Sequence, residues 1–467
     1  REFSPSSKKD DIMPSYQKKV EAVAEELGIE LVWRVPSNLE AQLMQDKQLT
    51  ICRNVFFQVD SAVQTCCENL VKHKSEIFDH IHTSVRYREN DITLEHIQLD
   101  LNSFLNSDAV ILLIDGAAGS GKSALVKQLT DGLTNDCAFF AFKSTDLDVN
   151  DILNFLTPYG ELNLDEVIDV YKMADTRVLY IDAAEKFFIC EYQETFEDIL
   201  NRFIAAGWKI ILTLRTAYRD SFQNSLLHGS KVQTYQVEPI NLDKLSTLSH
   251  TYGFQLPQDK RLLDLLCAPF YLGLYLALEN LEDESMRSLN REAFEEKIWN
   301  DIIRNNRKRK DNLPTRRETA LISLTTKMLR NEIYYYEILA EDDSEALSEL
   351  EKSGVLFQSD DARRYLHGHD VFEELVVGHI FTERYRHGIL NEQFFADFPP
   401  SLRIRKLFRG WLADFAAVPT HQELIFHLLD CEQVERIWKD EILLTVISTE
   451  SLKEVYQKLT QKMAANN

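Results

Sequence analysis

The apolar residues in the middle of the chain fall into short unbroken runs that are separated by longer amphipathic stretches. Strands buried on both faces of a sheet read as unbroken apolar runs, and strands that alternate with helices are typical of a parallel sheet. The pattern therefore predicts an α/β unit with buried strands at residues 109–114, 138–142, 178–181, 210–214 and 232–237.

The segments before this unit are predicted to be mainly helical. The periodicity of apolar residues indicates helices at 16–27, 38–44 and 59–83, and one strand at 29–35. The part that follows Pro239 is also helical in pattern, almost to the end of the chain.

One interruption breaks the helical pattern of the second half. Residues 354–365 read GVLFQSDDARRY, which we interpret as a short hairpin with Asp360 and Asp361 at its turn. We find no internal repeat of fixed period and no low-complexity stretch.

The charge balance narrows the classes of partner. The chain has 467 residues with 52 Lys and Arg against 75 Asp and Glu, so its formal net charge is −23. Such a chain repels nucleic acid and anionic membranes as a whole, although a local basic patch stays compatible with it. The basic run at 307–310 is expected to be a solvated helix end or loop.

The cysteines and the apolar runs suggest a cytoplasmic protein without a membrane helix. The seven cysteines are scattered and show neither a CxxC pair nor a zinc-ligand spacing, which favours reduced thiols. The longest apolar run, 268–278, is far shorter than the roughly 20 residues of a membrane helix. Because the chain begins with Arg-Glu-Phe, we expect it to be a piece of a longer protein.

A phosphate-binding loop follows the first predicted strand of the α/β unit. Residues 116–123 read GAAGSGKS and fit GxxxxGK[ST] between a strand and an amphipathic helix at 122–133. The glycines let successive N–H groups point at phosphates, while the lysine reaches the β- and γ-phosphates and the serine ligates Mg²⁺. The alternative is an accidental glycine-rich turn. We expect ATP or ADP with Mg²⁺ to bind here, at Gly116, Ala117, Ala118, Gly119, Ser120, Gly121, Lys122, Ser123 and Ala124.

Two carboxylates follow the third predicted strand. Placed beside the P-loop strand, Asp182 would hold Mg²⁺ together with Ser123, and Glu185 would polarise the attacking water as a general base. Either carboxylate could instead be the N-cap of a helix.

The fourth predicted strand ends in polar residues as well. Ligands of open parallel sheets sit at the carboxyl ends of strands, so Thr213 or Arg215 is a candidate sensor of the γ-phosphate. The alternative for Arg215 is a surface salt bridge. The candidate catalytic residues are thus Lys122, Asp182, Glu185 and Arg215.

The order of these motifs resembles the signal-transduction ATPases with numerous domains (STAND), in particular their NACHT-like branch. Segment 265–272, LLCAPFYL, is similar to the family's helical-domain motif, whose proline (here Pro269) packs on the adenine. Segment 366–375, LHGHDVFEEL, is similar to the winged-helix segment whose histidine (here His369) meets the phosphates in the closed state. One departure is Ala183-Ala184 where the family often has Asp-Gly before its second acidic pair, and Lys186 follows Glu185. This departure bears on the rate of hydrolysis.

The resemblance extends into both flanks. Arg86 and Tyr87, followed by 91–94, resemble the strand that precedes the P-loop in large bacterial antiviral STAND proteins, and we include both among the nucleotide-binding residues. Residues 33–43 are similar to the closing segment of nuclease-type effector domains, and 436–448 to the start of the family's helical sensor. A nuclease effector activity would then lie largely outside this chain.

Two of these positions keep alternative interpretations. His367 and His369 form an HxH pair that could begin a metal site, or His369 could be a structural histidine instead of a nucleotide contact. Pro269 could simply start a helix.

The expected fold class is α/β plus α, with a parallel-sheet P-loop ATPase domain, a small helical domain, a winged-helix domain and helical flanks. The expected boundaries are the end of an effector domain at 1–58, a helical linker and strand at 59–100, the nucleotide-binding domain at 101–240, the small helical domain at 241–285, the winged-helix domain at 286–385 and the start of the sensor at 386–467.

The resemblance implies an ATP-dependent switch that hydrolyses ATP slowly. Its implied partners are further copies of itself, with a tetramer as one candidate size, and a protein trigger, such as a viral protein, that a C-terminal sensor detects. Nucleic acid would be met only through the attached effector. Two other classes stay open: an AAA+ or origin-binding ATPase that acts on nucleic acid or protein, and a scaffold that binds nucleotide without hydrolysis.

Overall fold

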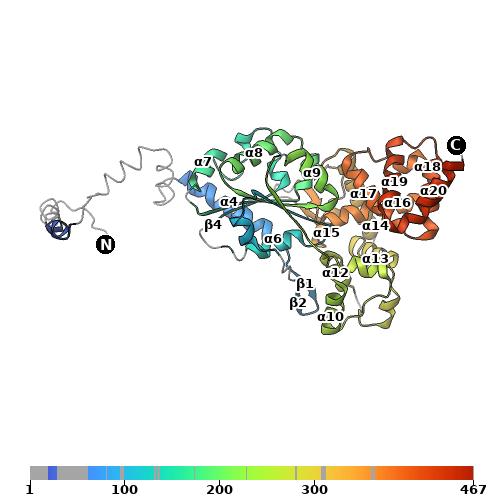
Figure 1. Ribbon diagram of the computed structural model, residues 1–467. Helices are drawn as coiled ribbons and strands as arrows, with labels where there is room; N and C mark the ends of the chain where they lie inside the picture. The colour runs from blue at the N-terminus through green and yellow to red at the C-terminus, as the bar shows by residue number, and fades with distance from the viewer. Residues whose placement is uncertain are drawn as a thin grey trace.

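A parallel sheet of five strands forms the centre of the molecule (Figure 1). The computed structural model describes residues 19–20, 22–28, 61–79, 81–94, 99–130, 133, 137–172, 174–227, 229–278, 281–306, 312–358 and 363–465. The sheet confirms all five predicted strands. Their bounds are β3 (Ile111–Gly116), β4 (Cys137–Lys143), β5 (Thr176–Asp182), β6 (Lys209–Arg215) and β7 (Val232–Gln236).

The order of the strands differs from the expectation in one respect. The sheet runs β4-β5-β6-β3-β7, so β6 lies between the P-loop strand β3 and the strand β5 that ends in Asp182. The prediction that β5 lies beside the P-loop strand was therefore wrong. The pattern of apolar residues cannot reveal this order, because β3, β5 and β6 are all buried along most of their length. The edge strand β7 is less buried than the sequence pattern predicted.

Helices cover both faces of the sheet. Side chains alternate between the faces of a strand, so Ile111 and Leu113 pack on one side while Leu112 and Ile114 pack on the other. The first side is covered by α7 (Leu164–Val170), α8 (Gln193–Ala205) and α9 (Arg219–Leu226). The second is covered by α5 (Leu101–Asn106), α6 (Lys122–Thr130) and the end of α4 (Ser61–Asp79).

A small helical unit lies beside the sheet and shares one apolar core with a β-hairpin (Figure 1). The hairpin pairs two short strands in antiparallel fashion and precedes the sheet in the chain. The helix α10 begins where the Asn241 side chain accepts a hydrogen bond from Lys244 N–H, and it ends at Gly253 with φ of 75°. The elements are β1 (Ser84–Tyr87), β2 (Asn90–Thr93), α10 (Leu242–Tyr252), α11 (Lys260–Leu266), α12 (Pro269–Leu276) and α13 (Arg291–Ile298).

The next part has the order helix, short strand, helix, hairpin, helix. The predicted hairpin is confirmed as two antiparallel strands, β9 and β10, and the short strand β8 joins it as a third. The predicted turn residues Asp360 and Asp361 lie outside the described residues. The elements are α14 (Leu313–Arg330), β8 (Tyr336–Glu337), α15 (Ser344–Lys352), β9 (Leu356–Gln358), β10 (Arg364–His367) and α16 (Asp370–Arg386).

The chain continues as a cluster of helices with its own aromatic core, in which Phe395 stacks on Trp438. These helices are α17 (Leu402–Phe415), α18 (Glu423–Asp430), α19 (Arg436–Ser448) and α20 (Lys453–Ala465).

At the start of the chain, only part of what the sequence suggests is described. Residues 22–26 are helical, within the predicted helix 16–27. The strand expected at 29–35, the helix at 38–44 and the basic run at 307–310 lie outside the described residues. No described helix is both long enough and apolar enough to cross a membrane.

Candidate nucleotide-binding site

The loop between β3 and α6 has the backbone that the motif requires. Gly119 and Gly121 have φ of 72° and 90°, a region that side chains other than glycine rarely adopt. A Cβ atom added to Gly116 would lie 2.6 Å from the Ser120 Oγ atom. Ser120 is itself buried, and its hydroxyl has no hydrogen-bond partner among the described residues. The loop thus has the curled backbone of a phosphate-binding loop, and it leaves the Ser120 hydroxyl without a hydrogen-bond partner among the described residues.

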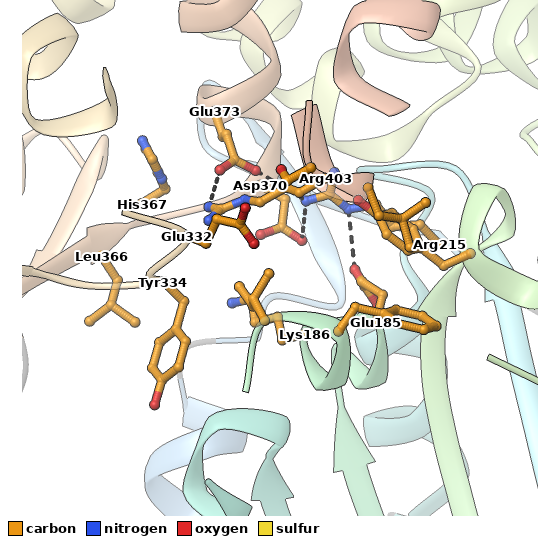
Figure 2. A pocket seen from close by; sticks show the side chains of 15 residues that line it. Glu185, Lys186, Arg215, Glu332, Tyr334, Leu366, His367, Asp370, Glu373 and Arg403 are labelled. Carbon is orange, nitrogen blue, oxygen red and sulfur yellow. Dashed lines mark hydrogen bonds and ion pairs between the residues drawn. The ribbon is translucent and has the colours of Figure 1, made fainter. Parts of the chain in front are cut away.

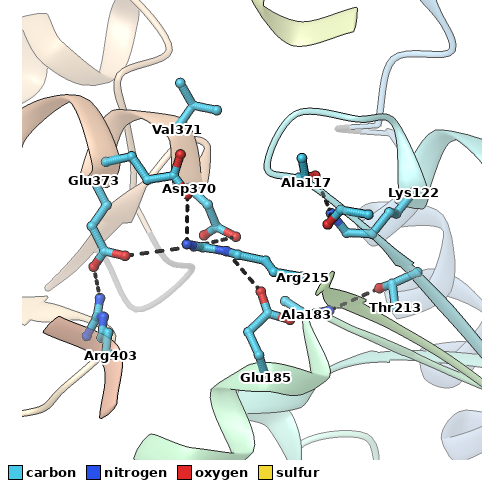
Figure 3. Close-up of polar contacts among 12 residues, drawn as sticks. Ala117, Lys122, Ala183, Glu185, Thr213, Arg215, Asp370, Val371, Glu373 and Arg403 are labelled. Atoms are coloured by element: carbon cyan, nitrogen blue, oxygen red, sulfur yellow. Dashed lines mark hydrogen bonds and ion pairs between the residues drawn. The ribbon is translucent and has the colours of Figure 1, made fainter. Parts of the chain in front are cut away.

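Lys122 lies folded back onto this loop (Figure 3). Its Nζ atom donates to the carbonyl oxygens of Gly116 at 3.2 Å and Ala117 at 2.8 Å. Burial lowers the pKa of the Lys122 ammonium, and the nearby carboxylate of Glu185 partly offsets this. The two carbonyl contacts hold the Lys122 amino group at the loop.

The small helical unit contacts the loop directly. Phe270 N–H donates to the Gly119 carbonyl at 3.1 Å, and a Cβ atom on Gly119 would lie only 2.8 Å from the Phe270 Cβ atom. Pro269 is the first residue of α12, so the helix-start alternative describes its local role. The proline fixes where the helix begins and thereby where Phe270 meets the loop.

Three hydroxyl groups meet at the carboxylate of Asp182. Its Oδ1 atom accepts from the hydroxyls of Ser123 at 2.8 Å, Tyr180 at 2.7 Å and Thr213 at 2.6 Å. The predicted metal pair, Ser123 and Asp182, is therefore in direct contact, although β6 lies between the P-loop strand and the strand that ends in Asp182. Thr213, on β6, adds a hydrogen bond to the same carboxylate.

The residue after Asp182 has a strained backbone. Ala183 has φ of 54° and ψ of 50°, the left-handed region, which costs an alanine roughly 1–2 kcal/mol. Its N–H donates to the Thr213 hydroxyl oxygen at 3.1 Å (Figure 3). This left-handed conformation turns the chain sharply after β5, so that Glu185 lies near the carboxyl ends of the strands.

Glu185 is buried and faces Arg215. Its Oε1 atom lies 3.2 Å from Arg215 Nε, while its Oε2 atom is buried without a hydrogen-bond partner among the described residues. Burial raises the pKa of Glu185, and the charge of Arg215 only partly offsets this. A carboxylate with a raised pKa and a free oxygen is suited to accept a proton from water.

Arg215 binds an acidic cluster on α16, which we define as Asp370, Glu373 and Glu374. The guanidinium lies 3.0 Å from Asp370, 3.1 Å from Glu374 and 3.8 Å from Glu373. Burial alone would lower the pKa of Arg215, but the carboxylates raise it well above its usual value. Figure 3 shows the guanidinium between Glu185 on one side and α16 on the other.

A small cavity adjoins this cluster. It has a volume of about 50 Å³ and lies where the ends of β5 and β6 meet α16 and the start of α17. Lys186 lines it together with His367 and Arg403 (Figure 2). Arg403 in turn pairs with Glu373, which links α17 to the acidic cluster.

The two histidines of the HxH pair have separate partners. His369 Nδ1 accepts from the N–H of Val371 at the start of α16, and its ring stacks on Phe270 at 3.8 Å between centroids. Burial lowers the pKa of His369 to about 4, so its ring is neutral at pH 7. His367 Nε2 lies 2.8 Å from the hydroxyl of Thr325. No group of three potential metal ligands occurs among the described residues.

Arg86 and Tyr87 occupy different environments. The Arg86 side chain is exposed and bonds to the carbonyl of Arg88 at 3.5 Å. Tyr87 is buried in the core of the small helical unit, with its ring edge against Phe254. The contacts of Arg86 therefore do not place it at the P-loop, and the expectation that it binds nucleotide rests on the resemblance alone.

The residues present fit a nucleoside triphosphate with a divalent cation. The loop offers backbone N–H groups, the Lys122 charge and the unpartnered Ser120 hydroxyl, which suit phosphate oxygens. Ser123 and Asp182 offer hard oxygen ligands of the kind that Mg²⁺ prefers. A bound cation would supply charge neutralisation to the phosphates.

Comparison with known proteins identifies no family for this chain. No family model and no curated protein matches the sequence. The Walker-type ATPase of Pyrococcus abyssi is similar in structure, with 15% identity and a TM-score of 0.31, over 59% of this chain and 93% of that one. The Aeropyrum pernix ORC1 protein in complex with DNA has 13% identity and a TM-score of 0.29, over 59% and 88%. AMPPCP-bound DnaA from Aquifex aeolicus has 15% identity and a TM-score of 0.27, over 54% and 85%.

The parallel sheet, together with the phosphate loop between β3 and α6, gives this part of the chain the fold of a P-loop ATPase. The sequence located the phosphate loop and the candidate carboxylates. It missed Tyr180, Phe270, Asp370 and Arg403 as parts of the site. A tyrosine two positions before Asp182 was a visible signal, because side chains two apart share a face of a strand.

We expect Lys122→Ala to weaken ATP binding by roughly ten- to a hundredfold, because it removes a charged hydrogen bond to phosphate. Binding of a fluorescent ATP analogue measures this. Lys172→Ala, which removes an exposed lysine, is the control and should bind normally. Unchanged affinity in a folded Lys122→Ala protein would show that the nucleotide site lies elsewhere.

We also expect opposite effects from two neighbouring substitutions. Ala183→Gly removes the left-handed strain and should leave the melting temperature unchanged or raise it. Ala184→Gly removes a fully buried methyl group from a helical turn and should lower stability by about 1 kcal/mol. Thermal unfolding of both variants tests this, and a lower melting temperature for Ala183→Gly would contradict the backbone assignment.

Proposed function

We propose that this P-loop ATPase is an ATP-dependent conformational switch and that the described structure is its closed form. The carrying observation is that Arg215, at the end of a central strand, binds the acidic cluster of α16. A residue in that position is suited to sense a γ-phosphate. In the closed form its charge is already neutralised by another part of the chain.

Several contacts support the proposal that α16 reports on the nucleotide site. His369 stacks on Phe270, which bonds to the P-loop. Val371 Cγ2 lies 3.5 Å from the position of a Cβ atom on Gly119. A change in the loop or in Arg215 is therefore felt at the start of α16 without any intermediate residue.

The switch follows from competition for one guanidinium. A γ-phosphate that draws Arg215 toward it leaves the acidic cluster with fewer counter-charges, which weakens the docking of α16. Moving a two-state equilibrium from 1:99 to 99:1 requires about 5.5 kcal/mol of differential binding. A few charged hydrogen bonds of about 1.5–3 kcal/mol each supply that amount.

The finer function that we propose follows the STAND resemblance. The open form assembles into a homo-oligomer and activates an attached effector after a protein trigger binds, in antiviral defence. Hydrolysis of ATP with Mg²⁺ returns the switch to the closed form, with Glu185 as general base. Glu185 pairs with Arg215 in the closed form, so hydrolysis is slow until a γ-phosphate draws the guanidinium away from Glu185.

An AAA+ or origin-binding ATPase is the alternative, and ORC1 and DnaA are among the similar structures. Because their TM-scores are low, we decide between the two proposed functions on the residues of this chain. In a helix-turn-helix the second helix enters the major groove. Here that helix, α15, carries Glu345, Glu349 and Glu351 against a single lysine. Together with the net charge of −23, this disfavours DNA binding through the winged-helix part.

We expect neutralising the acidic cluster to open the switch. Asp370→Asn with Glu374→Gln removes two partners of Arg215 and should raise the open population roughly ten- to a hundredfold per lost contact. Hydrogen exchange at α16 in ADP and oligomer size in ATP measure this. Glu383→Gln makes the same charge change further along α16, where Glu383 pairs with Arg386, and should change neither. Unaltered exchange and assembly in the double variant would refute the switch.

We expect no DNA binding by the chain. Anisotropy with labelled duplex and single-stranded DNA at low salt should show none up to roughly 10⁻⁴ M, the weak end of non-specific binding. Tighter binding that falls steeply with salt would favour the origin-binding alternative.

A further inference from the structure

One carboxylate oxygen in the candidate site accepts an unusual number of hydrogen bonds. The hydroxyls of Ser123, Tyr180 and Thr213 all donate to Asp182 Oδ1, at 2.8, 2.7 and 2.6 Å. No hydrogen bond to Asp182 Oδ2 is found among the described residues. The donors therefore hold one oxygen of the carboxylate and leave the other available.

We propose that Tyr180, together with Thr213, is a positioning residue that holds Asp182 in the orientation needed to bind Mg²⁺. The proposal rests on the proposed function, since it assigns a role at the same nucleotide site. Ser123 is itself a metal-ligand candidate, and its hydroxyl leaves Asp182 when it turns to a cation. Tyr180 and Thr213 then remain as the groups that orient the carboxylate.

The surroundings of Tyr180 fix its hydroxyl in place. The side chain is fully buried, and its ring lies parallel to that of Phe78 with 5.9 Å between centroids. The hydroxyl is held 2.7 Å from Asp182 Oδ1, and this contact does not depend on Ser123.

Thr213 makes a second hydrogen bond, so substituting it tests the orientation of Asp182 less selectively than substituting Tyr180 does. Its oxygen accepts from the N–H of Ala183 at 3.1 Å while its hydroxyl donates to Asp182. Loss of Thr213 would therefore also release the strained turn. Tyr180→Phe removes a single oxygen atom and keeps the ring, so it isolates the effect on the carboxylate.

The chain offers a matched control for this substitution. Tyr275 is also fully buried, and its hydroxyl donates to the carbonyl of Gln255 at 2.6 Å in the core of the small helical unit. Tyr275→Phe removes the same atom from a buried hydrogen bond that does not involve Asp182. Any general cost of losing a buried hydroxyl is common to both variants.

The experiment measures how binding of a fluorescent ATP analogue by the full chain depends on Mg²⁺ concentration. Residues that orient a metal ligand typically contribute ten- to a hundredfold in metal affinity. We expect Tyr180→Phe to raise the half-saturating Mg²⁺ concentration roughly tenfold or more, while affinity for the analogue in EDTA is unchanged. Tyr275→Phe should leave both quantities unchanged. Equal Mg²⁺ dependence in the two variants would overturn the inference and leave Tyr180 with a structural role.

A second substitution separates this inference from the proposed function. If Ser123→Ala raises the half-saturating Mg²⁺ concentration and Tyr180→Phe does not, the metal site stands and the role of Tyr180 is wrong. If neither substitution changes that concentration, the metal site itself is wrong, and this inference is wrong as well. Should Tyr180→Phe fail to fold, Thr213→Val against Thr213→Ser makes the comparison: the valine should raise the half-saturating concentration and the serine should not. Equal values for those two would overturn the inference.

Discussion

The arrangement of the parts depends on the neutralisation of one buried charge. A guanidinium out of water is costly unless carboxylates surround it, and Arg215 has Glu185 on its own domain and the acidic cluster on α16. The ATPase sheet alone supplies one of these carboxylates. The described arrangement is thus stabilised by a charge whose further counter-charges come from α16, and that charge lies at the carboxyl end of a central strand.

The sequence predicted the sheet well because burial on both faces leaves a plain record. Runs such as the one at 109–114 have no polar interruption, and the phosphate loop directly follows that run, so fold and loop could be located together. The apolar runs do not reveal the order of the strands in the sheet. β5 and β6 are similarly apolar, and only the fold shows that β6, with Thr213, lies between the P-loop strand and the strand that ends in Asp182.

The sequence pattern did not reveal Asp370 and Arg403 as parts of the site, and the physical reason is a different one. Asp370 and Arg403 lie far along the chain from the P-loop, and each looks like an ordinary surface charge in sequence. Their significance comes from long-range packing that brings the start of α16 and the start of α17 to the ends of β5 and β6. For Arg86 the resemblance predicts a contact with the nucleotide. In the structure its exposed side chain bonds to the carbonyl of Arg88 in its own turn.

The position of α17 has a consequence for how this protein tolerates change. Arg403 pairs with Glu373 of α16, Lys406 donates to the carbonyl of Ala217 beyond β6, and Asp414 pairs with Arg291 of the small helical unit. On another side of the helix, Arg405 and Arg409 both contact the buried Glu441 of α19. Substitutions in one short helix therefore act on contacts with four other parts of the chain. Their effects will not be additive, so sequence drift in the C-terminal helices is constrained by residues as far as 189 positions earlier.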